Sequence, residues 1–217
     1  MIGFSERRVA MVDCQIRPSD VTKFPIIKAM LEVPREEFVP DRAREFAYAD
    51  DHVELERNRV LLAPRTFAKM LDGLDIRPNE LVLDVGSGLG YSTAVIARMA
   101  EAVVALEEIE EFARQAVTKL SRHLVDNSLA VTGTLAEGAA KHGPYDVIVV
   151  EGAIHRLPDQ LFDQLKVGGR IGALFCDGVT GRCSIGIRQP GSISWRTAFN
   201  AGAPVIPGFE AQTEFVF

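Results

Sequence analysis

Three glycines at two-residue spacing follow a short apolar run and precede a helix-like segment. The run covers residues 81–85 and contains Asp84, and the glycines are Gly86, Gly88 and Gly90. Glycine adopts backbone angles closed to other residues and lets a ligand approach the main chain. In open α/β sheets, ligands bind at the carboxyl ends of strands. The segment therefore predicts a small-molecule site at the end of a strand.

The acid beside these glycines indicates the type of ligand. A dinucleotide places its pyrophosphate on the N-terminus of the following helix, and Asp84 would put a negative charge near that phosphate. S-adenosylmethionine has no phosphate and carries an ammonium and a sulfonium, which a nearby carboxylate favours. The Gly-x-Gly-x-Gly spacing also departs from the Gly-x-Gly-x-x-Gly of dinucleotide sites. The loop is therefore predicted to bind S-adenosylmethionine, and a nicotinamide oxidoreductase is disfavoured.

A second acid, Glu107, ends the next apolar run. An acid at that place can accept hydrogen bonds from both ribose hydroxyls, which serves an adenosine in either cofactor. The alternative is a solvated helix start favoured by the helix dipole, and we apply it to Glu110 and Glu111. The predicted cofactor-binding residues are Asp84, Gly86, Ser87, Gly88, Gly90, Glu107, Glu108, Thr134 and Leu135.

From residue 81 onwards, short apolar runs alternate with helical patterns. Strands are expected at 81–85, 103–106, 129–131, 145–150 and 170–175. Helices are expected at 91–100, 110–124 and 157–165, the last closed by a turn at Gly168 and Gly169. This alternation predicts a parallel sheet covered on both faces. Residues 184–188, 192–199 and 213–217 are expected to add antiparallel strands.

Residues 1–78 have a different, mainly helical pattern. They are predicted to form a cap and substrate-side segment on a cofactor-binding core of residues 79–217. A helix is expected at 21–31, ended by Pro34, because proline disfavours helix in the residue before it. Pro64 suits the first turn of another helix, at 65–74. Residues 50–62 between them are expected to be irregular.

The bulk composition limits the classes of function. A net charge of -6 lacks the basic footprint of a nucleic-acid-binding protein. No apolar run has the length of a membrane span, and no secretory signal follows the N-terminus. The three cysteines are too few and too scattered for a disulfide framework or a zinc site. We therefore expect a cytoplasmic protein without a metal, a nucleic acid or a membrane as partner.

Several stretches, in order, resemble the protein-L-isoaspartate O-methyltransferase family. The family-specific part is Val33-Pro34-Arg35-Glu36-x-Phe38-Val39-Pro40, and the glycine loop, Glu107 and Tyr145-Asp146 follow. The resemblance implies a Rossmann-like α/β fold: a seven-stranded methyltransferase sheet, mostly parallel with antiparallel C-terminal strands, plus an N-terminal helical cap. It also implies a repair activity, in which S-adenosylmethionine methylates isoaspartyl carboxyls of aged proteins.

Three departures from the family pattern concern the site. Leu62 stands where the family has a serine at the transfer site, and leucine cannot donate a hydrogen bond to a substrate carboxylate. Thr134 replaces an aspartate that holds the adenine amino group and can still accept a hydrogen bond. Glu151 replaces a small residue after the fourth strand, where a carboxylate would oppose an anionic acceptor. The catalytic residue is therefore unassigned, with Glu151 as a candidate.

Other residues near the predicted site have two interpretations each. Glu151 is either a general base or positioning group, or a surface acid at a loop start. His155 on the same loop and His52 before the cap strand are either part of the acceptor pocket or incidental. Three arginines near the missing serine either bind an anionic acceptor or form a solvated face: Arg57, Arg59 and Arg65.

Three functions remain open from the sequence. The first is a methyltransferase that repairs isoaspartyl protein, as the family resemblance implies. The second is a methyltransferase of the same fold with another, small-molecule acceptor, which Leu62 and Glu151 favour. The third is a cofactor-binding protein without turnover. Methyl transfer needs little side-chain chemistry beyond alignment of acceptor and donor, so the missing serine does not decide between them.

Overall fold

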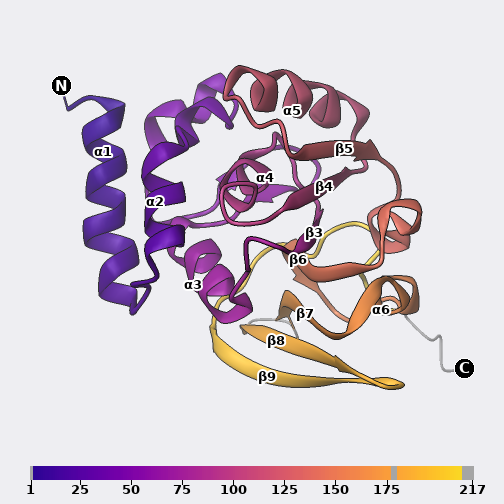
Figure 1. Cartoon of the computed structure of the whole chain (residues 1–217). Helices are drawn as coiled ribbons and strands as arrows, with labels where there is room; N and C mark the ends of the chain where they lie inside the picture. Colours follow the sequence, from indigo (N-terminus) through magenta and orange to yellow (C-terminus); the bar gives the residue numbers. More distant parts are fainter. Residues whose placement is uncertain (1, 177–179, 212–217) are drawn as a thin grey trace, which may run out of the picture.

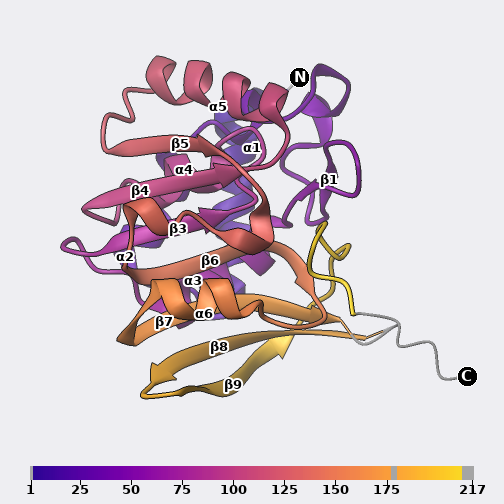
Figure 2. The same ribbon diagram turned by 90° about the vertical axis from the view of Figure 1, so that its right-hand side faces the viewer.

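A sheet of seven strands organises residues 2–176 and 180–211, which the computed structural model describes. The strands follow the order β5-β4-β3-β6-β7-β8-β9, and Figure 2 shows them in this order from top to bottom. Their bounds are β3 Leu81–Val85, β4 Ala102–Glu107, β5 Ser128–Thr132, β6 Tyr145–Ile154, β7 Leu165–Cys176, β8 Gly181–Gln189 and β9 Ser192–Asn200. β3 to β7 are parallel, and β8 and β9 are antiparallel. The predicted sheet is confirmed.

Strand order reverses at β3, and this fixes where a ligand can bind. β3 pairs with β4 on one side and with β6 on the other. The connections therefore leave the carboxyl ends of β3 and β6 in opposite directions. The carboxyl ends of these two strands are where doubly wound sheets hold their ligands.

Side chains alternate along the strands and feed two apolar cores. Val82 and Val149 pack in the first core with helices α2 (Phe24–Glu32), α3 (Pro64–Leu74), α4 (Tyr91–Ile96) and α5 (Glu110–Arg122). Leu83 and Val150 pack in the second core, below α6 (Asp159–Gln164). This period of two is what a strand with both faces buried requires. The helices of the chain's first half lie on one face of the sheet (Figure 1).

The N-terminal segment consists of helices and turns packed on that face. α1 (Phe4–Met11) continues into a π-helical turn at Val12–Ile16, and 3₁₀ turns follow α2 at Arg35–Glu37 and Asp41–Phe46. α2 begins with Pro25 in its first turn and ends before Pro34, as the proline positions predict. Met30 of this segment shares the first core with the sheet residue Val149. The division at residue 78 thus separates sequence patterns, while the apolar core continues across it.

Two expectations about local structure are wrong. Residues 50–62 are not wholly irregular, because β1 (Val53–Glu54) and β2 (Val60–Leu61) form a short antiparallel hairpin. Arg57 and Asn58 make its turn, with positive φ values of 50° and 61° that suit a type I′ turn. Gly168 and Gly169 lie inside β7 as an irregularity of the ladder with β6, instead of a turn that ends a helix.

The remaining predicted elements agree with the structure or lie outside the described residues. Strands and helices from residue 81 to 175 are confirmed with shifts of a few residues at their ends, which is normal for helix and strand boundaries. Residues 213–217, expected to form a strand, lie outside the described residues. None of the described helices combines the length and apolar character needed to cross a bilayer.

Candidate functional site

The glycine loop has the backbone conformation that its sequence requires. Gly86, Gly88 and Gly90 have φ values of +84°, +56° and +95°, a region that side chains with a Cβ rarely adopt. The amides of Gly86 and Ser87 donate to the carbonyl of Leu106 at 2.8 and 3.2 Å. The loop is thereby fastened to the end of β4 and leads directly into α4.

Asp84 lies at the end of β3 and is fully buried beneath the loop. Its Oδ2 accepts hydrogen bonds from the hydroxyls of Ser92 and Thr93, at 2.7 and 2.6 Å. Its Oδ1 has no hydrogen-bond partner within the described part of the chain. Burial raises the pKa of Asp84 to about 6, although the two hydroxyls act in the opposite direction. The carboxyl therefore anchors α4 and keeps one oxygen free.

Glu107 ends β4 and gathers the donors around it. Its Oε2 accepts the Gly88 amide at 2.7 Å, and its Oε1 accepts the amides of Glu108 and Ile109 at 2.9 and 3.0 Å. The Glu107 side chain is fully buried, whereas the Glu108 side chain is exposed and only its amide takes part. Glu107 is thus rigidly oriented toward the glycine loop, as expected of an acid that binds a ribose.

Arg59 of the β1–β2 hairpin lies against the same two elements. Its Nη1 is 2.8 Å from Oε1 of Glu107, and its Nη2 donates to the Gly86 carbonyl at 2.5 Å. Only 1% of each side chain of this ion pair is exposed. Sequence reasoning placed Arg59 on the acceptor side, and the structure places it among the predicted cofactor-binding residues. No sequence signal could show this, because the partners of Arg59 are remote along the chain.

The other two arginines of the predicted cluster lie apart from Arg59. Arg57 is exposed at the hairpin turn, and Arg65 forms an ion pair with Asp50 at 2.8 Å. The interpretation of the three arginines as one anion-binding cluster is therefore wrong. Arg57 lies in the turn itself and is exposed, whereas Arg59 follows the turn and is buried.

Glu151 and Arg35 form the acceptor-side part of the buried cluster. Glu151 lies in β6 with 3% of its surface exposed, and its Oε1 has no hydrogen-bond partner among the described residues. Burial raises its pKa well above the usual range, and Asp84 raises it further. Arg35 donates to the carbonyls of Ala47 at 2.6 Å and Leu62 at 2.7 Å, which brings the segment of the missing serine close to this cluster.

The remaining candidate residues have structural partners. Leu135 is buried in the second core, and Thr134 is exposed at the turn after β5. The Nδ1 of His52 accepts the amide of Ala63 at 2.9 Å, and the Nδ1 of His155 accepts the amide of Ala211 at 2.7 Å. Both histidines therefore fasten loops, which supports the incidental interpretation. The adjacent amide of Gly133 donates to the Glu107 carbonyl at 3.1 Å, so Thr134 stays beside the predicted adenosine site.

Unpartnered buried polar atoms gather at this edge of the sheet. Such atoms are rare in folded proteins, because each costs the free energy of its lost hydration. Five of those found in the described part of the chain belong to this cluster: Arg35 Nη1, Arg59 Nε, Asp84 Oδ1, Tyr91 OH and Glu151 Oε1. These unpartnered donors and acceptors lie beside the glycine loop, whose glycines have no Cβ atoms. Together they fit a polar ligand that carries a cation and hydroxyls.

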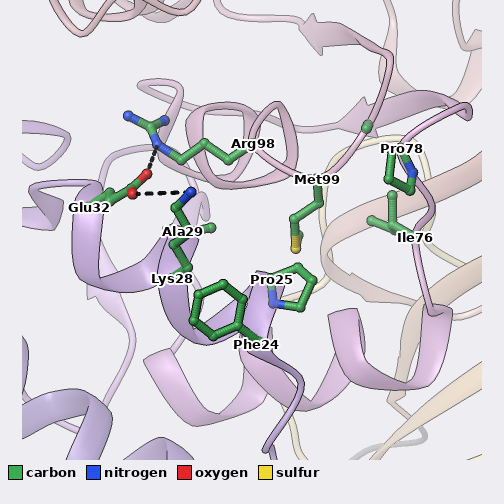
Figure 3. Close-up of a pocket in the computed structure, with 10 residues that line it drawn as sticks. Phe24, Pro25, Lys28, Ala29, Glu32, Ile76, Pro78, Arg98 and Met99 are labelled. Atoms are coloured by element: carbon green, nitrogen blue, oxygen red, sulfur yellow. Dashed lines mark hydrogen bonds and ion pairs between the residues drawn. The ribbon is translucent and has the colours of Figure 1, made fainter.

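A separate groove lies between α2 and the segments that follow α3 and α4. It has a volume of about 340 Å³ and is lined by Phe24, Ile76 and Met99 among others. The ion pair of Glu32 and Arg98 borders it (Figure 3). None of its lining residues belongs to the glycine loop or to the buried polar cluster. The groove therefore does not serve the predicted cofactor.

The sheet, the glycine loop at its switch point and the acid at the end of the next strand define an S-adenosylmethionine-dependent methyltransferase. Residues 6–173 match the protein-L-isoaspartate(D-aspartate) O-methyltransferase (PCMT) family, and the chain belongs to this family. The family resemblance stated from the sequence is therefore confirmed, and the methyl donor of the family is S-adenosylmethionine.

Individual relatives agree with this assignment. A protein-L-isoaspartate O-methyltransferase of Koribacter versatilis is 36% identical over 79% of this chain and 77% of its own length. A protein-L-isoaspartate O-methyltransferase 1 of a Polaromonas species is 39% identical over 79% of this chain and 72% of its own.

Two solved structures share the fold. The structure of a protein-L-isoaspartate O-methyltransferase superposes with a TM-score of 0.80 at 23% identity, over 95% of this chain and 66% of that one. A Plasmodium falciparum protein described as a beta-aspartate methyltransferase (PCMT), in complex with S-adenosyl-L-homocysteine, has a TM-score of 0.77 at 20% identity. This superposition covers 92% of the present chain and 97% of the Plasmodium falciparum chain. At these identities the superpositions show the fold alone.

Proposed function

We propose that this protein transfers the methyl group of S-adenosylmethionine to the α-carboxyl of isoaspartyl residues in aged proteins. Membership of the family supports this function, and the state of Glu151 is the observation that carries it. As a surface acid, Glu151 would repel a carboxylate acceptor. As a fully buried group beside Asp84, it has a pKa raised well above the usual range, because burial and the nearby Asp84 charge both disfavour the charged form.

The raised pKa of Glu151 favours its protonated form, and this changes the electrostatics expected on the acceptor side. A protonated carboxyl is a hydrogen-bond donor as well as an acceptor. In that form Glu151 would supply a donor that Leu62 lacks. Among the described residues, Arg35 Nη1 is a further buried donor of this cluster without a hydrogen-bond partner. An anionic carboxyl acceptor would thus meet the Arg35 cation and an acid whose charged form is disfavoured, where the sequence suggested only a repelling charge.

The chemistry asks little more of the chain. S-adenosylmethionine, when bound, supplies an already activated methyl group, so the protein has to align donor and acceptor and exclude water. The glycine loop with Glu107 would hold the nucleoside, and Thr134 lies beside the same acid. Arg35 and Glu151 would orient the acceptor carboxyl. No acid–base group is needed, because a carboxylate is already the reactive form.

A second acceptor class is favoured by one observation. The Leu62 side chain is fully buried in the first core, so neither its position nor its chemistry replaces the family serine. A small-molecule acceptor would not need the hydrogen bond that a serine gives to a peptide carboxylate. The protein would then keep the cofactor and the fold while acting on another substrate.

A methyl-transfer assay separates these functions. S-adenosylmethionine with a tritiated methyl group is incubated with an isoaspartyl peptide, and the same peptide with normal aspartate is the matched control. We expect base-labile label on the isoaspartyl peptide alone. Label on neither peptide, in a sample that binds S-adenosylhomocysteine by calorimetry, would contradict the isoaspartyl function and lead to a screen of small-molecule acceptors.

We also propose the cytoplasm as the location of this activity. Support comes from the cysteines, since Cys14, Cys176 and Cys183 are all unpaired. Free thiols are typical of reducing compartments. Fractionation of the source cells, with detection of the chain by antibody, checks this location, and recovery in a membrane or secreted fraction would contradict it.

A further inference from the structure

The cofactor cradle is filled by the chain itself. A Cβ placed on Gly86 would lie 2.7 Å from Nη2 of Arg59, and a Cβ placed on Gly88 would lie 2.8 Å from Cδ1 of Leu55. Both residues belong to residues 53–61, the β1–β2 hairpin. The surface that glycines leave open for a ligand is therefore covered by two side chains of one hairpin.

Arg59 uses the acceptors that a methyl donor would need. S-adenosylmethionine presents an ammonium and two ribose hydroxyls, which are all hydrogen-bond donors. The guanidinium of Arg59 is also a hydrogen-bond donor. Its Nη1 donates to Glu107 at 2.8 Å, and its Nη2 donates to the Gly86 carbonyl at 2.5 Å. It is also cationic, so it neutralises the same buried acid. Arg59 and the ribose cannot both occupy Oε1 of Glu107.

We propose that the β1–β2 hairpin is an internal occupant of the cofactor site, which S-adenosylmethionine displaces by driving Arg59 away from Glu107. The proposal rests on the proposed function only in taking S-adenosylmethionine as the ligand of this site. The hairpin thus regulates the cofactor affinity of the enzyme.

The backbone of the hairpin pairs apart from the main sheet, although its side chains Val53, Leu55, Val60 and Leu61 belong to the first apolar core. β1 and β2 are two residues each and pair only with each other, in a sheet separate from the main one. Its tip, residues 56–58, is exposed. Figure 2 shows β1 outside the main sheet, beside the arrowhead ends of the parallel strands. Movement of this segment would leave the main ladder intact.

Displacement also preserves the environment of Glu107. Three backbone amides, of Gly88, Glu108 and Ile109, donate to its carboxylate without Arg59. These three donors therefore keep the side chain of Glu107 oriented when the guanidinium departs. Once released, Arg59 regains hydration outside the cradle. Only molecules in which the hairpin has moved away can bind the cofactor. The apparent dissociation constant is therefore the intrinsic one divided by the fraction of such molecules.

Replacing the guanidinium tests this competition directly. S-adenosylhomocysteine is titrated by calorimetry into the wild type, into Arg59→Met and into Arg57→Met. Methionine keeps an apolar stem and removes the charge and the donors. We expect Arg59→Met to bind at least tenfold more tightly than the wild type. Arg57→Met removes the same charge from the exposed tip and should stay within twofold. Equal or weaker binding by Arg59→Met would overturn the proposal.

A second measurement on the unaltered protein does not depend on a variant. Trypsin needs the arginine side chain in its pocket, so the bond between Arg59 and Val60 resists cleavage while Arg59 is buried. We expect saturating S-adenosylhomocysteine to accelerate this cleavage several-fold, as measured by mass spectrometry. Protection of the bond by the ligand would mean that the hairpin closes over the cofactor and would overturn the proposal. Neither measurement contains a methyl acceptor, so failure of isoaspartyl transfer leaves both results unaffected.

Discussion

The parallel strands hold acidic side chains differently at their two ends. We call the side of the sheet where these strands begin the amino edge and the side where they end the carboxyl edge. At the amino edge, Glu80 receives both terminal nitrogens of Arg170 at 2.7 Å. Asp146, which opens β6, accepts the Leu81 amide and the Lys166 ammonium at 2.9 and 2.8 Å. At the carboxyl edge, Asp84 and Glu151 each retain a buried oxygen that has no hydrogen bond from residues 2–176 or 180–211. The acids of the amino edge are thus paired with basic side chains, whereas those of the carboxyl edge keep oxygens without a partner.

The pKa values follow the same division. Burial raises the pKa of Glu80, but the hydrogen bonds from Arg170 and from the Arg77 amide outweigh it and leave the pKa below its usual value. At the other edge burial prevails, and the pKa values of Asp84 and Glu151 are raised. Perturbed acids of this kind concentrate at functional sites. The comparison therefore supports the proposal that the carboxyl edge, and not the amino edge, is the ligand site.

The largest expected effect contrasts one acid from each edge. Glu107→Gln removes the charge and one acceptor for the ribose, so we expect S-adenosylhomocysteine to bind at least tenfold more weakly by calorimetry. Asp84→Ala should weaken binding to a similar extent. Glu80→Gln, the matched change at the amino edge, should lower the unfolding temperature and leave affinity within twofold. Unchanged binding in both Glu107→Gln and Asp84→Ala would contradict the assigned site.

The next effect is a pH dependence that comes from Glu151. Because its folded pKa is raised, the folded state holds an extra proton, and stability falls as pH rises from the unfolded pKa toward the folded one. Glu151→Gln removes this dependence. We expect Glu151→Gln to unfold at a temperature roughly 2–4 °C above that of the wild type at pH 8, which corresponds to about 1 kcal/mol in the free energy of unfolding. The difference should be much smaller at pH 4. An equal shift at both pH values would mean that Glu151 is charged.

The amino edge should show the opposite sign. The folded pKa of Glu80 is lowered, so its contribution is present above the unfolded pKa and is lost as pH falls through the folded pKa. We expect denaturant titrations to show Glu80→Gln less stable than the wild type at pH 7 by about 1–3 kcal/mol. The difference should shrink at pH 3. A difference that grows in acid would contradict this assignment.

The smallest effect concerns the partly exposed ion pair of Lys166 and Asp146. Its side chains keep 43% and 24% of their surface exposed, so solvent and salt screen the attraction. Lys166→Met should cost less than about 1 kcal/mol in chemical unfolding. Affinity for S-adenosylhomocysteine should not change. A tenfold loss of affinity would show that the two edges are coupled and would remove the basis of the comparison.

The sequence predicted the elements whose signals are local. The run at β3, the glycines with positive φ and the proline in the first turn of α3 act through neighbouring residues, and each appears where it was expected. The hairpin at residues 53–61 was missed because its strands are only two residues long. The turn at Arg57 and Asn58 lacks the glycine that commonly marks such turns.

The site was predictable in composition and not in arrangement. Asp84 and Glu107 were identified because a strand end fixes where their side chains lie. Glu151 was assigned a repelling charge, since a sequence does not show how completely a group is buried or that Asp84 faces it. Arg59 was placed on the wrong side, because its partner Glu107 lies far along the chain. Burial and long-range pairing are properties of the fold and have no local signature.

The most direct test of the central claim is a map of amide hydrogen exchange at both edges, with and without S-adenosylhomocysteine. If the carboxyl edge is the cofactor site, the ligand should slow exchange at Gly88 and Ile109, around the glycine loop and the end of β4. Exchange at Leu81 and Lys166 of the amino edge should not change. Protection confined to the amino edge, or to the groove around Phe24 and Met99, would contradict the assignment of the carboxyl edge as the cofactor site.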